Sequence, residues 1–166
     1  MLSVVSTVAT RSITRVRLSA LVAGAALAVA GLAQAQDASQ APNYGTVSLT
    51  GGFQPDPHIL NLQAGGDIDA SHLGGKCAGM ISSAPDYRIN YTPSNGLKLT
   101  VRVRSQGDTT LVINGPDGQW SCSDDLAGTT NPGITWQRPP AGVYDIWVGA
   151  FSDTGVDAQL RVTELE

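Results

Sequence analysis

The sequence predicts an all-β protein, an antiparallel β-sandwich of the jelly-roll or immunoglobulin-like kind with about eight short strands. Beyond residue 36, no stretch repeats its apolar residues with the period of a helix. Gly, Pro, Asn and Asp interrupt the chain about every ten residues, which is typical of strands joined by turns. The stretch from Leu97 to Arg104 alternates apolar and polar residues without a break, as a strand with one buried face does.

Three strands are expected in the first half of the domain, over Thr46–Thr50, His58–Leu62 and Tyr87–Tyr91. Each is short and rich in Val, Ile, Leu, Tyr or Thr, the residues that favour strands. The intervening stretch Ala64–Met80 is rich in glycine and fits neither a helix nor a strand pattern. It is therefore left without an assignment.

The central part of the chain predicts a hairpin. Leu97–Arg104 is followed by a turn at Gln106–Asp108 and by a second apolar stretch, Thr109–Ile113. The tight-turn sequence Asn114–Gly118 then leads into a short returning strand over Gln119–Ser121.

Three further strands are expected toward the C-terminus, over Ile134–Gln137, Val143–Phe151 and Ala158–Thr163. In the second of them, alternation places Ile146 and Val148 on one face and Trp147 and Phe151 on the other. Two antiparallel sheets packed face to face accommodate this number of strands.

The first 35 residues have the order of a secretory signal peptide. A basic segment that contains Arg11, Arg15 and Arg17 precedes the apolar run Leu18–Leu32, and the small-residue pattern Ala33-Gln34-Ala35 follows. The alternative is a membrane anchor, but a run of about 15 residues is shorter than the roughly 20 that a span needs. We expect cleavage after residue 35, a linker over 36–45 and one domain over 46–166, in a secreted or periplasmic protein with no membrane span after cleavage.

Charge narrows the possible partners. The chain has 10 basic and 14 acidic side chains, and removal of the leader leaves seven basic against the same fourteen. A nucleic-acid partner is not expected, because such a partner requires a basic surface. Binding to anionic lipid is not expected for the same reason.

The chain contains two cysteines, Cys77 and Cys122. An even number of cysteines in an exported chain predicts a disulfide between them. The alternative is a pair of free buried thiols. A zinc site is not favoured, since the chain has no closely spaced Cys or His pairs.

Several short motifs of the C-terminal half resemble the bacterial pre-peptidase C-terminal domain family. They are Gly107-Asp108-Thr109-Thr110-Leu111, Gly115-Pro116-Asp117-Gly118, Cys122-Ser123-Asp124-Asp125, Asn131-Pro132 and the stretch from Pro140 to Gly149. The resemblance implies a small secreted β-sandwich that serves as a non-catalytic accessory or binding module. It also implies that calcium or a polymeric protein substrate is a conceivable ligand. The stretch from Asn43 to Tyr91 lies outside the resemblance.

An acid-rich loop is the candidate metal site. Asp117, Asp124 and Asp125 lie within nine residues of one another, and calcium is bound by such carboxylates together with backbone carbonyls. The alternative is that these residues are ordinary solvated turn residues, since Asp favours turns. The hypothesis is a calcium site, and no other cofactor is expected.

Aromatic side chains are the candidate binding surface. Trp147 and Phe151 share the face opposite Ile146 and Val148, which makes them available to a partner if that face is exposed. The alternative assigns Trp136 and Tyr144 to the core and packs Trp120 against the disulfide.

Catalysis is not expected. The Asp153-Thr154-Gly155 sequence is similar to the aspartic protease motif, but that chemistry needs two such carboxylates and more chain beyond the motif. No serine-nucleophile or phosphate-binding motif is present. The sequence therefore favours a secreted accessory module that binds a protein or polysaccharide surface. The alternatives are a structural or assembly subunit of an extracellular complex and, less favoured, a small hydrolase.

Overall fold

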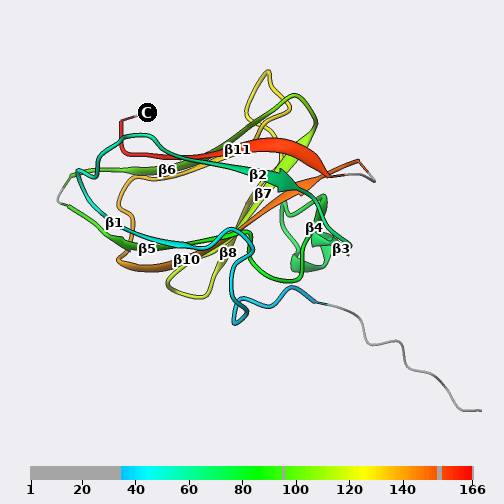
Figure 1. Ribbon diagram of the computed structural model, residues 1–166, viewed down its shortest axis with the longest axis horizontal. Helices are drawn as coiled ribbons and strands as arrows, with labels where there is room; N and C mark the ends of the chain where they lie inside the picture. Colours follow the sequence, from blue (N-terminus) through cyan, green and yellow to red (C-terminus); the bar gives the residue numbers. More distant parts are fainter. Residues whose placement is uncertain (1–34, 95, 153–154, 166) are drawn as a thin grey trace, which may run out of the picture. The chain divides into compact units, whose positions relative to one another are not determined.

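The computed structural model describes residues 35–94, 96–152 and 155–165. The predicted leader, apart from Ala35, and the Asp153-Thr154 pair lie outside these residues. The described chain forms two β-sheets that pack face to face (Figure 1), which confirms the predicted all-β sandwich. The sole helix in these ranges is one turn of 3₁₀-helix, η1 (Ala70–Leu73).

The first sheet has seven strands. Its strands are β1 (Thr46–Thr50), β3 (Ile68–Asp69), β4 (Met80–Ile81), β5 (Tyr87–Thr92), β7 (Thr109–Asn114), β8 (Trp120–Ser123) and β10 (Gly142–Ala150). The long strand β10 is central: β5 and then β4 pair along one side of it, and β7 pairs along the other. Pairing is antiparallel except between β1 and β5, which run parallel. The predicted wholly antiparallel arrangement is therefore wrong at this edge.

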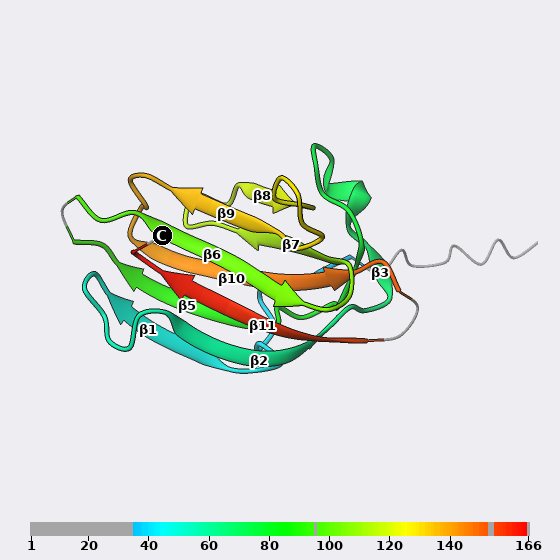
Figure 2. The ribbon, with the colours of Figure 1, turned by 90° about the horizontal axis from the view of Figure 1, so that it is seen from above.

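The second sheet has four strands in the order β2-β11-β6-β9, all antiparallel (Figure 2). They are β2 (His58–Ala64), β11 (Val156–Thr163), β6 (Leu99–Ser105) and β9 (Gly133–Trp136). The alternation predicted for β6 is confirmed at Leu99, Val101 and Val103, which are buried, and at Arg102 and Arg104, which are not. It is wrong at Thr100, which lies on the predicted polar face and is fully buried.

The predicted hairpin between β6 and β7 is wrong. Strand β6 pairs with β11 and β9 in one sheet, whereas β7 pairs with β10 and β8 in the other. The turn at 106–108 therefore carries the chain from one layer of the sandwich to the other. Alternation shows which face of a strand is buried, but it does not show which strands pair with that strand. It therefore does not distinguish a hairpin within one sheet from a connection between the two sheets.

The main core lies between the sheets and is built from the inward residues of both. Its largest fully buried side chains include Tyr91, Tyr144, Ile89 and Leu99. Trp136 is half-buried and packs edge-on against Tyr144, with ring centroids 5.3 Å apart. The prediction that both belong to the core is confirmed for Tyr144 and holds in part for Trp136.

The segment 36–45, expected to be a linker, is tied to the first sheet. The Asp37 and Asn43 amides donate to the carbonyls of Ser83 and Pro85. The Arg88 guanidinium reaches back to the Ala38 carbonyl. This segment belongs to the same compact unit as the strands.

Candidate functional site

A groove of about 950 Å³ runs over the outer face of the four-stranded sheet. Side chains that point outward from β2, β11 and β6 form its floor, and the loop 126–131 forms one wall. Tyr44 contributes the one aromatic side chain of the lining. The polar floor residues are Asn61, Gln63, Arg102, Arg104, Asp157 and Gln159.

The register of the strands places side chains of β2, β11 and β6 side by side in rows that run across the sheet. Arg161 of β11, which borders the groove and is not part of its lining, lies directly opposite Arg102 of β6. In the next row, Gln159 lies between Asn61 of β2 and Arg104 of β6. The Gln159 amide donates to the Asn61 side-chain oxygen at 3.2 Å, and the Arg161 guanidinium donates to the Gln159 oxygen at 2.9 Å. The floor is therefore a partly ordered polar surface that combines cations and amides.

The wall of the groove is held by local hydrogen bonds. The Asn131 side-chain oxygen accepts from the Ser105 amide at 2.6 Å, which fastens the loop to the end of β6. Gly133 leaves room at the base of this wall: a Cβ there would lie 2.9 Å from Leu126 Cδ1 and 3.0 Å from Arg102 Cγ, so these side chains would have to shift. The loop is thus fixed close over the sheet, and the groove is formed in advance of any ligand.

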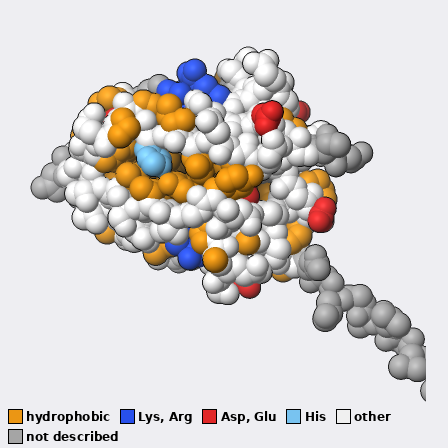
Figure 3. All heavy atoms as spheres, in the orientation of Figure 1, with side chains coloured by type: hydrophobic (Ala, Val, Ile, Leu, Met, Phe, Trp, Pro, Cys, Tyr) orange, Lys and Arg blue, Asp and Glu red, His pale blue; other side chains and the backbone are white. Residues whose placement is uncertain are grey.

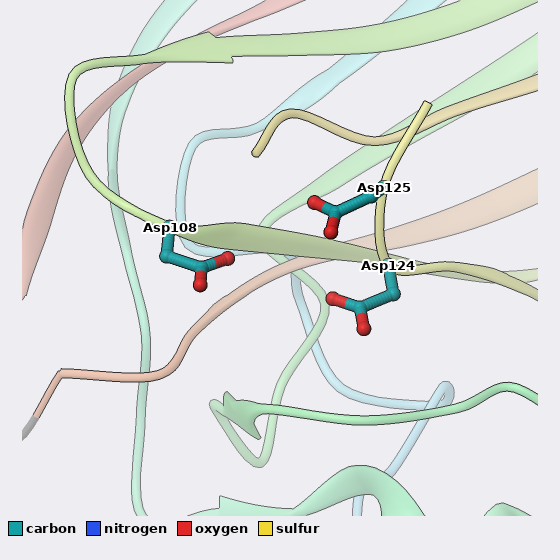
Figure 4. A group of neighbouring side chains, drawn as sticks. All are labelled: Asp108, Asp124 and Asp125. Carbon is teal, nitrogen blue, oxygen red and sulfur yellow. The ribbon is translucent and has the colours of Figure 1, made fainter. Parts of the chain in front are cut away.

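A second candidate site is a cluster of three carboxylates, Asp108, Asp124 and Asp125 (Figure 4). One oxygen from each lies within 4.8 Å of the others. The register of β7 with β8 explains the cluster, since Asp108 immediately precedes β7 and the other two follow β8. Carboxylate oxygens at this spacing are suitable ligands for calcium.

The electrostatics of the cluster centre on Asp124. Burial, followed by the negative charges of Asp125 and Asp108, raises the pKa of the Asp124 carboxyl above its usual value. Its Oδ1 is buried and has no hydrogen-bond partner among the described residues. A small surface pocket adjoins the cluster and is lined by Asp124, Asp125 and Lys76. The Lys76 ammonium group thus places a positive charge near these carboxylates.

Asp117, expected to share the metal site with Asp124 and Asp125, is not part of this cluster. It lies in the exposed turn between β7 and β8, where its Oδ1 accepts from the Gln119 amide at 3.0 Å. A carboxylate that stabilises its own turn in this way is the ordinary role of Asp. Asp108 takes its place beside Asp124 and Asp125.

The prediction that Trp147 forms an exposed binding surface is wrong, because this side chain is fully buried. The outer face of β10 is covered at its C-terminal half by a second, smaller core. That core contains Trp147, Val112, Ile81, Ile68 and Ala70. The covering chain comes from β3, η1 and β4, which lie in the stretch to which the sequence pattern assigned no structure.

Phe151 directly follows β10 and is 51% exposed. A binding role for this side chain stays a prediction. The alternation assigned Trp147 and Phe151 to one face, but Phe151 lies just beyond the end of β10 and is exposed, whereas Trp147 is buried.

The predicted disulfide between Cys77 and Cys122 is confirmed. It joins the loop after η1 to strand β8 and packs with Trp120 against the second core, as expected. The rings of Trp120 and Trp147 are 5.4 Å apart. Disulfides persist in oxidising compartments, so the bridge indicates a location outside the cytoplasm.

Sequence reasoning missed the arginines of the groove and the part played by Asp108. Arg102 and Arg104 were visible as the polar face of a strand, but their proximity to Arg161 depends on the pairing of β6 with β11. Asp108 was visible only as a turn residue. In both cases the missing information was which strands are neighbours.

Comparisons with known proteins leave the family open. No family model matches the chain, and no curated protein matches it. Two solved structures are similar over 71% of the chain. The pre-peptidase C-terminal domain of a collagenase from Bacillus anthracis is 12% identical, with a TM-score of 0.39 over 94% of that chain. PliG from Aeromonas hydrophila, a periplasmic inhibitor of g-type lysozyme, is 16% identical, with a TM-score of 0.36 over 96% of that chain.

The resemblance to the pre-peptidase C-terminal domain family accordingly stays a prediction.

Among the described residues, no helix is long and apolar enough to cross a membrane.

Proposed function

We propose that this protein is a non-catalytic, exported binding module that holds a partner in the groove over its four-stranded sheet. The observation that carries the proposal is the groove itself, a preformed hollow of about 950 Å³ with a polar floor. Preformed concave surfaces with a few converging polar groups are the usual places where proteins bind ligands. The partner is a secreted or surface protein, or a polysaccharide.

A steric block of the groove tests this proposal. In Gln159→Trp, an indole projects from the middle of the floor, where Gln159 lines the groove. We expect this variant to lose the partner that the wild-type oxidised protein captures from the culture medium. The matched control is Ser48→Trp, which places the same side chain on an exposed position of β1.

Loss of the same identified partner in Gln159→Trp but not in Ser48→Trp supports the proposal. Equal capture by both variants contradicts it. Thermal unfolding of each variant establishes that the fold is intact.

We also propose that calcium binds at Asp108, Asp124 and Asp125 and stabilises the module. Three convergent carboxylates and the unpartnered Oδ1 of Asp124 support this proposal. Burial, and then the repulsion from Asp125 and Asp108, raise the pKa of Asp124, and a divalent cation would offset that repulsion. Because a ligand of the native state stabilises it by mass action, millimolar calcium should raise the melting temperature.

Asp108→Asn should abolish this rise in melting temperature, whereas Asp117→Asn, in the neighbouring turn, should retain it. NaCl at the same ionic strength serves as the control for charge screening. A melting temperature that calcium leaves unchanged would remove the metal proposal and leave the binding function untouched.

A second candidate function is assembly with another copy of the chain through the free edge of the four-stranded sheet. Strand β2 forms this edge, and its Ile59 side chain is 44% exposed. A band of hydrophobic side chains crosses the middle of the face shown in Figure 3, between the two sheets. Edge strands pair readily with a second copy. Concentration-dependent sedimentation that Ile59→Lys abolishes would favour this function, and a monomer at all concentrations would exclude it.

A further inference from the structure

We infer that the groove binds an acidic, extended polypeptide segment, and that Arg102 and Arg104 of its lining, together with Arg161 at its border, receive the carboxylates of that segment. The inference rests on the proposed function and adds the chemical class of the ligand. It follows from the charges on the floor, their spacing and the other side chains between them.

The floor gathers positive charge on a sheet face. Arg161 and Arg102 occupy directly opposed positions on neighbouring strands, and Arg104 follows on the same face of β6. Like charges at opposed positions destabilise a sheet. An arrangement that opposes folding and lies in a preformed groove is characteristic of a surface kept for a ligand.

The chain supplies little counter-charge to this group. Within residues 35–94, 96–152 and 155–165, neither Arg104 nor Arg161 has a carboxylate within ion-pair distance. Asp157, the acid of the lining, is hydrogen-bonded to the Gln63 amide. In Figure 3, blue side chains lie along the top of the molecule, on the side where Figure 1 labels β6 and β11, and a smaller blue group lies at the bottom. An anionic ligand would provide carboxylates for Arg104 and Arg161, because arginine forms paired hydrogen bonds with a carboxylate.

The spacing of the arginines fits an extended peptide. Arg102 and Arg104 are two residues apart on one strand, so their Cα atoms are separated by about 7 Å. An extended ligand repeats its side chains on one face at the same interval of about 7 Å. A segment with an acid at every second residue can therefore meet successive arginines along the groove.

The remaining lining favours a peptide over a polysaccharide. Asn61 and Gln159 present amide groups that can pair with peptide bonds, and Leu126 in the wall offers an apolar contact. Sugar rings are commonly bound on aromatic faces, and the lining has only Tyr44.

The experiment titrates the oxidised protein with a fluorescently labelled peptide of four Glu-Thr repeats and follows fluorescence anisotropy. The reference ligands are the matching Gln-Thr peptide and an oligogalacturonate, a carbohydrate with the same acidic groups. We expect the Glu-Thr peptide to bind in preference to both. Its affinity should fall steeply as NaCl rises from about 50 mM to about 300 mM.

The double variant Arg104→Gln/Arg161→Gln should weaken this binding by at least about tenfold. The control is Lys98→Gln/Arg138→Gln, which removes the same charge from positions outside the groove lining and should bind as the wild type does. Melting temperatures verify folding, and the groove variant should be no less stable, since it removes a like-charge pair.

Three results would overturn the inference: equal binding of the Gln-Thr peptide, equal weakening in the two double variants, or preference for the oligogalacturonate. Failure here is separable from failure of the proposed function. If Gln159→Trp loses the natural partner while Arg104→Gln/Arg161→Gln retains it, the groove binds but its ligand is not acidic.

Discussion

Trp147 shows how a single side chain can be on the predicted side of a strand and still be buried. Its indole lies in the second core beside Trp120, Val112 and the disulfide. Alternation within β10 gave the direction of the side chain correctly. The residues that cover Trp147 come from β3, η1 and β4, whose sequence has no periodic pattern. The burial of Trp147 therefore could not be predicted from the sequence of β10 alone.

Trp147→Ala should therefore destabilise the protein by about 3–5 kcal/mol, the usual loss for truncating a buried Trp. Urea unfolding measures this loss. Phe151→Ala is the matched control on the same face and should change the stability by less than about 0.5 kcal/mol, because Phe151 is largely exposed. Similar, small losses in the two variants would show that Trp147 is not in a core.

Asp86 lies where strand β10 stops pairing with β5, at Ile146, and before it pairs with β4, at Ala150. Its amide donates to the Ile146 carbonyl, and its carboxylate accepts from the Val148 amide at 2.7 Å. Burial raises the pKa of this carboxyl to about 6, against the opposing effect of its hydrogen bonds from Val148, Asn43 and Ser82. The side chain thus replaces a strand partner at Val148.

A raised pKa means that the folded protein holds the Asp86 proton more tightly than the unfolded chain does. The stability contributed by this group consequently falls as the pH rises from about 4 to about 6. Asp86→Asn, which does not titrate, should gain in urea midpoint relative to the wild type over that interval. Parallel pH profiles for the two proteins would contradict the assignment. At pH about 4, Asp86→Ala should lose about 1–3 kcal/mol of unfolding free energy, since it leaves the Val148 amide without a partner.

At the scale of elements, the strands with clear alternation were predictable and their partners were not. Leu97–Arg104 anticipated β6 to within two residues at its start and one at its end. Its placement beside β11, and not beside β7, depends on contacts between residues more than fifty positions apart. The two-residue strands β3 and β4 are too short for any period to be visible, and they exist because they cover Trp147.

The disulfide fixes the covering segment to β8. Cys77 and Cys122 are separated by 45 residues, and closing a loop of that length in the unfolded chain should stabilise the protein by about 4 kcal/mol. Cys77→Ser/Cys122→Ser should lower the unfolding free energy by about 2–5 kcal/mol in urea titrations.

Reducing agent should reproduce this loss in the wild type and have no effect on the double variant. An unchanged urea midpoint in the double variant would mean that the bridge contributes nothing to the second core.

At the scale of the whole molecule, the sandwich brings residues that are far apart in the sequence together on its surface. The polar faces of β2, β6 and β11 become the floor of one groove, and the residues around β7 and β8 become an acidic cluster. The sequence could predict the all-β class, the disulfide and two of the three clustered acids. It could not predict the groove, because every row of its floor joins residues from different strands.

The central claim is that the outer face of the four-stranded sheet is the binding face. Chemical-shift mapping of the oxidised, nitrogen-15-labelled protein during titration with the Glu-Thr peptide tests it most directly. Amide shifts should be confined to residues 102–104 of β6, the loop 126–131 and residues 157–161 of β11. Shifts that centre on β1 and β5 would contradict the claim, whereas no shifts at all would contradict the acidic ligand inferred for the groove.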